Sequence, residues 1–177
     1  MAEGYVFMAT TIDGYIAREN DEIDFLMKYD PQGEDHGYDK FIEDKDAIIM
    51  GSGSFKTILG FDSWPYSLPV YVMSKSMKDS EIPEHLKGKV FLSTQNPEDL
   101  MNSLAGQGIN RLYIDGGRLV SSFIELGLIK EMTLTILPIL LGKGRSLFQS
   151  FSKDIDLKLI SNKSFKCGFV QNTYQFI

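Results

Sequence analysis

The chain has 177 residues, 43% of them hydrophobic and 24% charged, and its 24 acidic and 18 basic residues give a formal net charge of −6. This length suits one domain, residues 1–177, and the acidic balance disfavours nucleic acid and anionic membranes as partners, because both need clustered Lys and Arg. One cysteine, two separated histidines, no basic leader and no apolar stretch of roughly 18 residues exclude a disulfide framework and a membrane span, and predict a cytoplasmic protein without a metal.

Short β-branched and aromatic runs alternate with helical patterns along most of the chain, which indicates an α/β fold. Asn96 is expected to cap a helix that has Pro97 in its first turn, and Gly127 is expected to end a later one. The predicted strands are 5–10, 46–50, 70–73, 90–92 and 112–114, and the predicted helices are 36–43, 54–59, 96–106 and 118–126.

The pattern changes after Lys130. Met132, Leu134 and Ile136 alternate with polar residues, which predicts a strand with two unlike faces. Residues 157–160 and 169–176 are expected to close the sheet as an antiparallel pair.

Two glycines and two serines follow the predicted strand at 46–50, namely Gly51, Ser52, Gly53 and Ser54. Glycines at a strand-to-helix junction let backbone amides approach an anion, and the serine hydroxyls would add donors. A tight turn with a capping serine explains the same residues equally well.

A second junction, Asp115-Gly116-Gly117-Arg118, follows the predicted strand at 112–114. Two consecutive glycines remove both Cβ atoms where a pyrophosphate would meet the helix N-terminus, although the spacing is not that of the dinucleotide-binding fingerprint. Asp115 either caps the helix or contacts a ligand hydroxyl, and Arg118 either pairs with phosphate or faces solvent.

Ser74 and Lys75, directly after the strand at 70–73, offer a hydroxyl and a point charge for a third phosphate contact. In open α/β sheets ligands bind at the carboxyl ends of the strands. The three places together therefore predict one extended, multiply anionic ligand.

Several ordered motifs match a known family. They are Thr-Ile-Asp-Gly-Tyr-Ile-Ala at 11–17, Ile-Met-Gly at 49–51 with Thr57, Tyr-Ile-Asp-Gly-Gly at 113–117, and the segment from Leu128 through Leu-Pro-Ile-Leu-Leu-Gly-Lys-Gly-Arg at 137–145 to Phe148. Over essentially its full length the chain resembles the dihydrofolate reductase-like superfamily, and more closely stand-alone proteins related to the C-terminal reductase domain of the riboflavin-biosynthesis protein RibD.

The resemblance implies a three-layer α/β fold with a mixed, mostly parallel central sheet, an antiparallel C-terminal strand and flanking helices. It also implies NADPH as the cofactor, a homodimer as the assembly, and a small-molecule substrate. The implied reaction reduces a small heterocyclic or sugar-linked imine or carbonyl, with the aminouracil ribosyl phosphate of riboflavin synthesis as the reference substrate.

Carried over by position, the resemblance also implies cofactor contacts. Ala9 and Ile16 would frame the nicotinamide through backbone groups, and Ser74 and Lys75 would lie near the adenosine ribose phosphate. The adenosine and phosphate side would be followed by Gly51, Ser52, Gly53 and Ser54, and the pyrophosphate would be held by Gly116, Gly117, Arg118, Leu119 and Val120.

Two departures from the family pattern bear on function. Relatives usually carry Arg or Lys where this chain has Ser52, and losing such a contact to the 2′-phosphate costs about 1.5–3 kcal/mol, so the preference for NADPH over NADH is open. The region 25–29 also lacks the first-helix carboxylate of true folate reductases. The alternative function is a catalytically weak nucleotide-binding or regulatory protein that retains the fold.

A reductase must also supply a proton, and the segment after the first strand offers Asp13 and Asp24. Asp13 is either a catalytic acid or an Asp-Gly turn residue. Asp24 stands between Ile23 and Phe25, where burial would raise its pKa and make it a usable acid, unless it is an exposed loop residue.

The substrate side has its own candidates. Arg145 and Lys143 form the compact basic pair for a substrate phosphate, unless they belong to a tight turn whose charges face water. Phe25, Trp64 and Tyr66 would stack on a flat heterocycle, unless they pack inside the protein.

Overall fold

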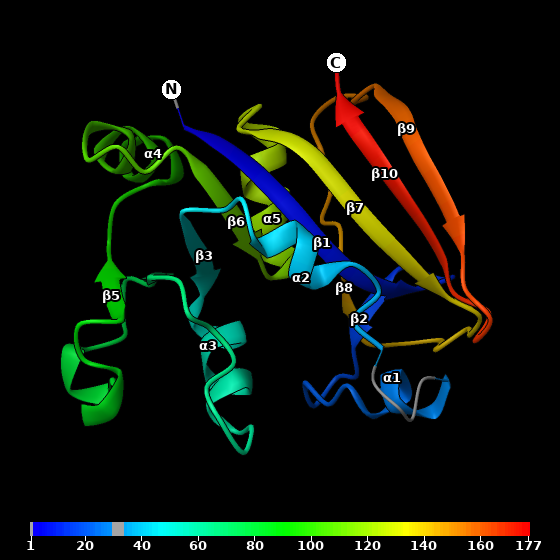
Figure 1. The fold of residues 1–177 in the computed structure, drawn as a ribbon, viewed down its shortest axis with the longest axis horizontal. Coiled ribbons are helices and arrows are strands. Elements are labelled where there is room, and N and C mark those ends of the chain that lie inside the picture. The colour runs from blue at the N-terminus through cyan, green and yellow to red at the C-terminus, as the bar shows by residue number, and fades with distance from the viewer. Residues whose placement is uncertain (1, 30–33) are drawn as a thin grey trace.

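The computed structural model describes residues 2–29 and 34–177 and is built around an eight-stranded sheet (Figure 1). The strand order is β5-β4-β3-β6-β1-β7-β10-β9. The strands are β1 (Glu3–Thr11), β3 (Ala47–Gly51), β4 (Val70–Met73), β5 (Val90–Ser93), β6 (Arg111–Asp115), β7 (Ile129–Leu137), β9 (Leu157–Ser164) and β10 (Val170–Phe176).

The pairing confirms the expected mixed sheet. β1, β3, β4, β5, β6 and β7 all run parallel, whereas β10 is antiparallel to β7 and to β9. A second sheet, which the sequence did not indicate, pairs β2 (Tyr15–Ala17) with β8 (Arg145–Ser146). Because β8 pairs with β2, which follows shortly after β1, the segment around residue 145 lies near the carboxyl end of β1.

Five α-helices occur in the described ranges: α1 (Asp24–Tyr29), α2 (Tyr38–Ile42), α3 (Ser52–Leu59), α4 (Pro97–Gly106) and α5 (Gly117–Glu125). Two short 3-10 turns lie at Asp79–Glu81 and Glu84–Leu86. Asn96 caps α4 as predicted, its side-chain oxygen accepting from the amide of Asp99 at 2.9 Å, and Gly127 follows α5 with φ 68°. The helix α1 was not predicted. None of these helices is both long and apolar enough to cross a membrane.

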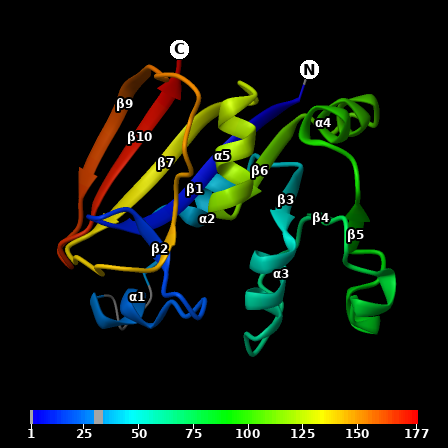
Figure 2. The same cartoon turned by 180° about the vertical axis from the view of Figure 1, so that it is seen from behind.

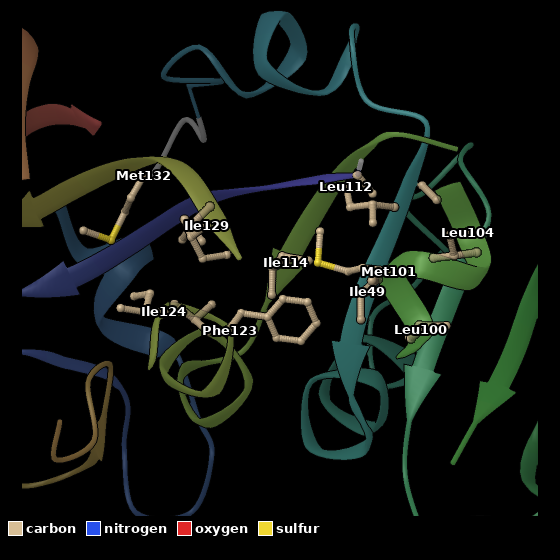
Figure 3. Packing of buried hydrophobic residues seen from close by; sticks show 14 residues of the cluster. Ile49, Leu100, Met101, Leu104, Leu112, Ile114, Phe123, Ile124, Ile129 and Met132 are labelled. Atoms are coloured by element: carbon tan, nitrogen blue, oxygen red, sulfur yellow. The ribbon is translucent and has the colours of Figure 1, made fainter. Parts of the chain in front are cut away.

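The helices cover the two faces of the sheet in pairs. On one face lie α4 and α5 (Figure 2). Their side chains, such as Leu104 and Phe123, pack against strand residues that include Ile49 and Ile114 (Figure 3). On the other face, Ile48 and Met50 pack with residues of α3 and α2. Ile48, Ile49 and Met50 are all fully buried, which confirms that β3 is covered on both sides.

The strand β7 has an apolar and a polar face, as predicted, and its polar face is buried as well. Thr133 and Thr135 are only 8% and 4% exposed. The hydroxyl of Thr133 lies 3.1 Å from that of Thr173, and the Thr135 hydroxyl accepts a hydrogen bond from the side-chain amide of Gln171 at 2.9 Å. β10 therefore covers these threonines and satisfies their hydroxyls, so alternation in the sequence did not mean exposure.

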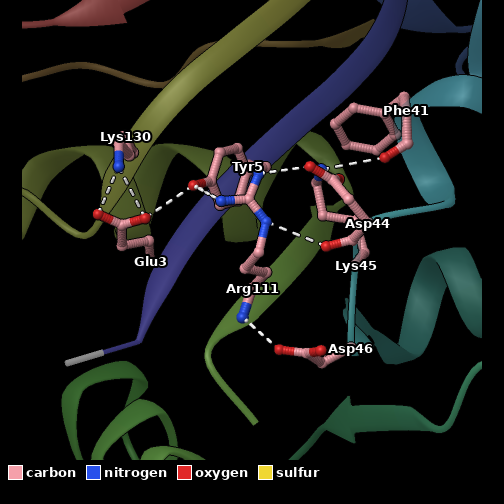
Figure 4. Close-up of polar contacts among 8 residues, drawn as sticks. All are labelled: Glu3, Tyr5, Phe41, Asp44, Lys45, Asp46, Arg111 and Lys130. Atoms are coloured by element: carbon pink, nitrogen blue, oxygen red, sulfur yellow. Dashed lines mark hydrogen bonds and ion pairs between the residues drawn. The ribbon is translucent and has the colours of Figure 1, made fainter.

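A polar network joins the amino ends of the central strands (Figure 4). Lys130 Nζ lies 2.7 Å from Glu3 Oε1, and Arg111 places Nη2 at 2.7 Å from Asp44 Oδ2 and donates from Nη1 to the Tyr5 hydroxyl at 2.7 Å. These charged groups satisfy one another across β1, β6 and β7. This network does not involve the opposite edge of the sheet, where the carboxyl ends of the parallel strands lie.

Candidate functional site

A large cavity opens at the carboxyl ends of the parallel strands. The β1–β6 ladder stops at the pair Tyr5 and Tyr113, although both strands continue, and the hollow beyond it has a volume of about 1040 Å³. β1 and β3 lead to helices on one face of the sheet, and β6 between them leads to α5 on the other. Crevices at such switch points are the usual ligand sites of open α/β sheets.

Most of the residues predicted to hold a cofactor lie together on the wall of this cavity. Ala9 lies in β1 and Ile16 in β2. Both line the cavity together with residues of the β3–α3 and β6–α5 junctions. The predicted residues on the wall are Ala9, Ile16, Gly51, Ser52, Gly53, Ser54, Gly116, Gly117, Arg118 and Leu119. The structure brings them into one place, and their contact with a cofactor stays a prediction.

Three predicted residues do not line the cavity. Val120 is a residue of α5 and is fully buried in the core that this helix forms with the sheet. Ser74 accepts hydrogen bonds from the amides of Ser76 and Met77 at 3.3 and 3.1 Å, so its hydroxyl closes the turn after β4. Lys75 is exposed beside it. Packing explains Val120 and turn closure explains Ser74 without a ligand.

No contact within the protein explains the two glycines at the β3–α3 junction, Gly51 at the end of β3 and Gly53 in the first turn of α3. Gly51 has an ordinary extended backbone, with φ −80° and ψ 162°. A Cβ added at Gly51 or at Gly53 would meet no atom within 4 Å, and both residues line the cavity. Neither backbone strain nor packing requires glycine here, and the open space next to both residues belongs to the cavity.

The glycines between β6 and α5 are required by the fold itself. Gly116 has φ 98°, a conformation that L side chains rarely adopt, and a Cβ there would lie 2.6 Å from Ser54 Oγ. A Cβ on Gly117 would lie 2.7 Å from the carbonyl oxygen of Ser146 and 2.9 Å from that of Leu147. The β8 segment thus packs directly on the start of α5.

Asp115 ends β6 and belongs to the cavity wall. The N-cap of α5 is Gly116, without a side-chain cap, so the expectation that Asp115 caps this helix is wrong. Its Oδ1 lies 3.3 Å from the Tyr113 hydroxyl. Burial raises the pKa of Asp115, although hydrogen bonds from Ser54, Tyr113 and the Gly116 amide act in the opposite direction.

The two predicted proton donors lie outside the cavity wall. Asp13 accepts from the Thr11 hydroxyl at 2.6 Å and from the amides of Leu141 and Gly142 at 3.1 and 2.7 Å. The Thr11 hydroxyl and those amides lower the pKa of Asp13 to about 2, so its carboxylate fastens the loop after β1 to the one after β7. Its catalytic role stays a prediction that these contacts do not support.

Asp24 is exposed and begins α1, so the hypothesis that burial raises its pKa is wrong. Arg18 donates to it from Nε at 2.5 Å and from Nη2 at 2.9 Å. These hydrogen bonds lower the pKa of Asp24 and favour its carboxylate form. The neighbouring Phe25 is the buried member of this segment, 1% exposed, and a proton-donating role for Asp24 stays a prediction.

The basic side chains of the loop after β7 form ion pairs with carboxylates of the protein. Arg145 Nε lies 2.7 Å from Asp21 Oδ1, and Lys143 Nζ lies 3.0 Å from Glu19 Oε2. Arg145 and Asp21 line the cavity, but all four side chains are largely exposed. This exposure agrees with the interpretation that the charges of the loop face water, although the ion pairs with the segment before α1 were not predicted.

Among the predicted aromatic residues, Tyr66 lines the cavity. Trp64 packs against Phe55 and Tyr66, with ring centroids 5.9 and 5.4 Å apart, and Phe25 lies in a small core with Phe169. Other wall residues that sequence reasoning missed come mostly from β1 and from loops, and no spacing in the sequence marks them. They are Phe7, Met8, Asp21, Ile23, Leu26, Ile58, Phe61, Met73, Ser122 and Gln149, besides Ala17, Thr57, Gly144 and Ser146, which lie within the family motifs.

The fold and the cavity together define an α/β protein with a large crevice at the carboxyl edge of its parallel strands. Residues 4–171 match the family described as the RibD C-terminal domain. The chain belongs to that family.

Relatives and solved structures agree with this assignment. The chain is 32% identical to the uncharacterized protein YyaP of Bacillus subtilis, over 96% of this chain and 92% of that protein. It matches a crystal structure from Shewanella sp. PV-4, provisionally assigned to riboflavin biosynthesis, with 37% identity, a TM-score of 0.93 and coverage of 100% and 99% of the two chains.

A more distant structure has the same fold. The riboflavin biosynthesis reductase Rib7 of Saccharomyces cerevisiae matches with a TM-score of 0.69 and 13% identity, over 99% of this chain and 90% of that one. The chain therefore shares the fold of this reductase, in addition to belonging to the RibD C-terminal domain family.

Proposed function

We propose that this chain is an NADPH-dependent reductase of a small heterocyclic or sugar-linked imine or carbonyl, similar to the 5-amino-6-(5-phosphoribosylamino)uracil reductase of riboflavin biosynthesis. The observation that carries the proposal is the pair Gly51 and Gly53, which line a cavity of about 1040 Å³ and whose missing Cβ atoms no contact within the protein explains. Family membership supplies the reaction class.

The cavity wall suits an extended dinucleotide. The turn Gly51–Ser54 offers backbone amides and two hydroxyls, and Arg118, for which the described residues provide no ion pair, stands at the start of α5. The opposite wall is apolar around Ile16 and Leu26 and would exclude water from a flat ring. Ala9 would contact that ring through its backbone.

When bound, the dihydronicotinamide supplies the hydride, which is chemistry of the cofactor and not of the protein. The chain's own residues must hold the ring against an electron-poor carbon, keep water away and provide a proton. Ser52 stands where relatives carry a cation, so the residues around it do not by themselves select NADPH over NADH.

The test is a titration of the purified chain with NADPH and, separately, NADH, followed by nicotinamide fluorescence. We expect saturable binding, and then oxidation of the cofactor in the presence of at least one member of a pterin, flavin and aminouracil panel. Absence of saturable binding of either nucleotide would refute the reductase. Binding without oxidation across the panel would favour the alternative, a nucleotide-binding protein without catalysis.

A homodimer is part of the proposal, and β9 is the strand best placed to form it. This outer strand is exposed at all eight positions, including Leu159 at 53% and Ile160 at 46%. Exposed apolar edge strands are ready surfaces for pairing. Light scattering should give a dimer for the wild type and a monomer for Leu159→Lys, and a monomeric wild type would contradict this part.

A further inference from the structure

The cavity reaches around the edge of the sheet onto the face that α2 and α3 cover. Phe7, Ile58 and Tyr66 line it and pack in the apolar cluster of that face. Ala9, two residues after Phe7 on the same face of β1, and Leu26 of α1 continue this surface, so that α3 and α1 stand on its two sides (Figures 1 and 2). These five residues form the apolar end of the cavity.

The aromatic rings at the apolar end are fixed by packing within the protein. Trp64 lies edge-on to Tyr66 with ring centroids 5.4 Å apart, and Tyr38 lies edge-on to Phe7 with centroids 5.7 Å apart. Apolar and aromatic walls with few polar groups are typical of sites for small organic ligands. The apolar end therefore suits a flat ring.

The hydroxyl of Tyr66 is the one polar side-chain group among these five residues. It makes no hydrogen bond to any other residue in the described ranges. Burial is the main cause that raises the pKa of Tyr66, so the group is a neutral hydroxyl with a proton to donate. A fixed donor on an apolar wall fits a ligand that brings its own hydrogen-bond acceptor.

The charged residues of the cavity wall leave no cation for a phosphate on the substrate. Among the described lining residues they are Asp21, Asp115, Arg118 and Arg145. Arg118 stands in the first turn of α5, beside the proposed cofactor phosphates, and Arg145 Nε lies 2.7 Å from Asp21 Oδ1. This exposed pair is weak by itself, but a phosphate that approached Arg145 would also meet the carboxylate of Asp21, and like charges in contact disfavour binding.

We propose that the substrate is an uncharged flat heterocycle without a phosphate group, and that the Tyr66 hydroxyl donates a hydrogen bond to a carbonyl oxygen or ring nitrogen of it. Asp21 holds Arg145 and keeps anions away from it. This inference rests on the proposed function and narrows its substrate class. The chain thereby differs from a reductase whose substrate carries a ribosyl phosphate.

The first test compares ligands that differ only in a phosphate. Protein saturated with NADP⁺, which has no hydride to give, is titrated by calorimetry with riboflavin and riboflavin 5′-phosphate, and with 5-amino-6-(ribosylamino)uracil and its 5′-phosphate. In at least one pair we expect saturable binding of the unphosphorylated member, roughly fivefold or more tighter than that of the phosphate. A smaller preference in both pairs, or no binding of any of the four, would overturn the proposal.

Tyr66→Phe removes the hydroxyl alone. The affinity for the preferred heterocycle should fall by roughly three- to tenfold, while the melting temperature stays within about 2 °C of wild type, because no described residue bonds to this hydroxyl. Tyr71→Phe, in a half-buried tyrosine of β4 that does not line the cavity, is the matched control and should change neither quantity. Unchanged affinity in Tyr66→Phe, or a lowered melting temperature, would overturn the role of Tyr66 in recognition.

Asp21→Asn releases Arg145 and keeps the backbone, since asparagine accepts the φ of 67° at this position. The affinity for the phosphates should rise by roughly tenfold, and that for their unphosphorylated partners should not change. Glu19→Gln releases Lys143, which does not line the cavity, and as the control it should change neither affinity. No gain for the phosphates in Asp21→Asn would overturn the role of Asp21.

These results separate the inference from the proposed function. If wild type binds no nucleotide, the proposed reductase fails. The same titrations of the nucleotide-free protein then still decide whether the cavity prefers the unphosphorylated heterocycle and whether Tyr66 recognises it.

Discussion

The two glycine-containing turns at the cavity have similar sequences, but the fold itself requires glycine in only one of them. In the turn from β6 to α5, Gly116 needs its positive φ and Gly117 packs against backbone carbonyls. In the turn from β3 to α3, Gly51 and Gly53 have permitted conformations and empty space around them. Glycine in a strand-to-helix turn therefore indicates a ligand only where the fold gives no reason of its own.

The largest expected effect is that of Gly117→Ala. The added Cβ would meet two carbonyl oxygens of the β8 segment, which cannot move as a side chain can. We expect a loss of roughly 3 kcal/mol and a melting temperature lower by about 10 °C. Thermal unfolding followed by circular dichroism measures it, and a melting temperature within 2 °C of wild type would contradict this account of the turn.

Gly116→Ala should cost less. The backbone strain at φ 98° is worth about 1–3 kcal/mol, but the clash is with the Ser54 hydroxyl, which can rotate away. Urea unfolding should therefore place this variant between wild type and Gly117→Ala. A variant as stable as wild type would mean that the turn does not need glycine.

Gly53→Ala tests the other turn and should separate stability from binding. Alanine favours the helix by roughly 0.5 kcal/mol, while its methyl group enters the cavity and should weaken NADPH binding by about tenfold. Gly106→Ala, in α4 and also without neighbours, is the matched control and should change stability alone. If Gly53→Ala and Gly106→Ala bound NADPH with equal affinity, the claim that the β3–α3 turn contacts the ligand would be contradicted.

Ser52→Arg asks what the β3–α3 turn recognises. Ser52 lines the cavity, and an arginine there would supply the cation that the family resemblance implies for the 2′-phosphate. A charge-assisted contact is worth about 1.5–3 kcal/mol, so the ratio of NADPH to NADH affinity should rise by roughly tenfold or more. Parallel titrations of both nucleotides measure this ratio, and an unchanged value would put the phosphate elsewhere.

The smallest effect concerns Asp13, which fastens the loop after β1 beside this cavity. Its folded pKa of about 2 lies below the ordinary value of about 3.9, so its contribution to stability is present above pH 4 and is lost as the pH falls toward 2. Asp13→Asn should be less stable than wild type at pH 6, and the gap should narrow at pH 3. A gap independent of pH would contradict the role of its charge.

The sequence predicted the sheet well because its strands are marked locally. Val70–Met73 is continuous and apolar, and β4 has those bounds. The helix α1 and the strands β2 and β8 escaped prediction because they are short and depend on pairing with distant segments, such as Tyr15 with Ser146. No local pattern reports such a pairing.

The site was predicted unevenly for a physical reason. Residues that follow strands, such as Gly53 and Arg118, could be named from the sequence because parallel strands end at one edge. The carboxyls that line the cavity, Asp21 and Asp115, could not be told apart from Asp13 and Asp24, because burial and hydrogen-bond partners distinguish them and the sequence does not report either. Val120 was assigned to the cofactor by position, although it faces the core.

The most direct test of the central claim is amide chemical-shift mapping of the wild-type chain during titration with NADPH. The account predicts saturable shifts at Gly51, Ser52, Gly53 and Ser54, joined by those of Gly116 and Arg118 on the facing turn. A smaller hollow of about 620 Å³ beside Phe151 and Ser152 serves as the internal comparison. Shifts confined to that hollow, or no saturable shift at Gly51 to Ser54, would contradict the assignment of the cavity.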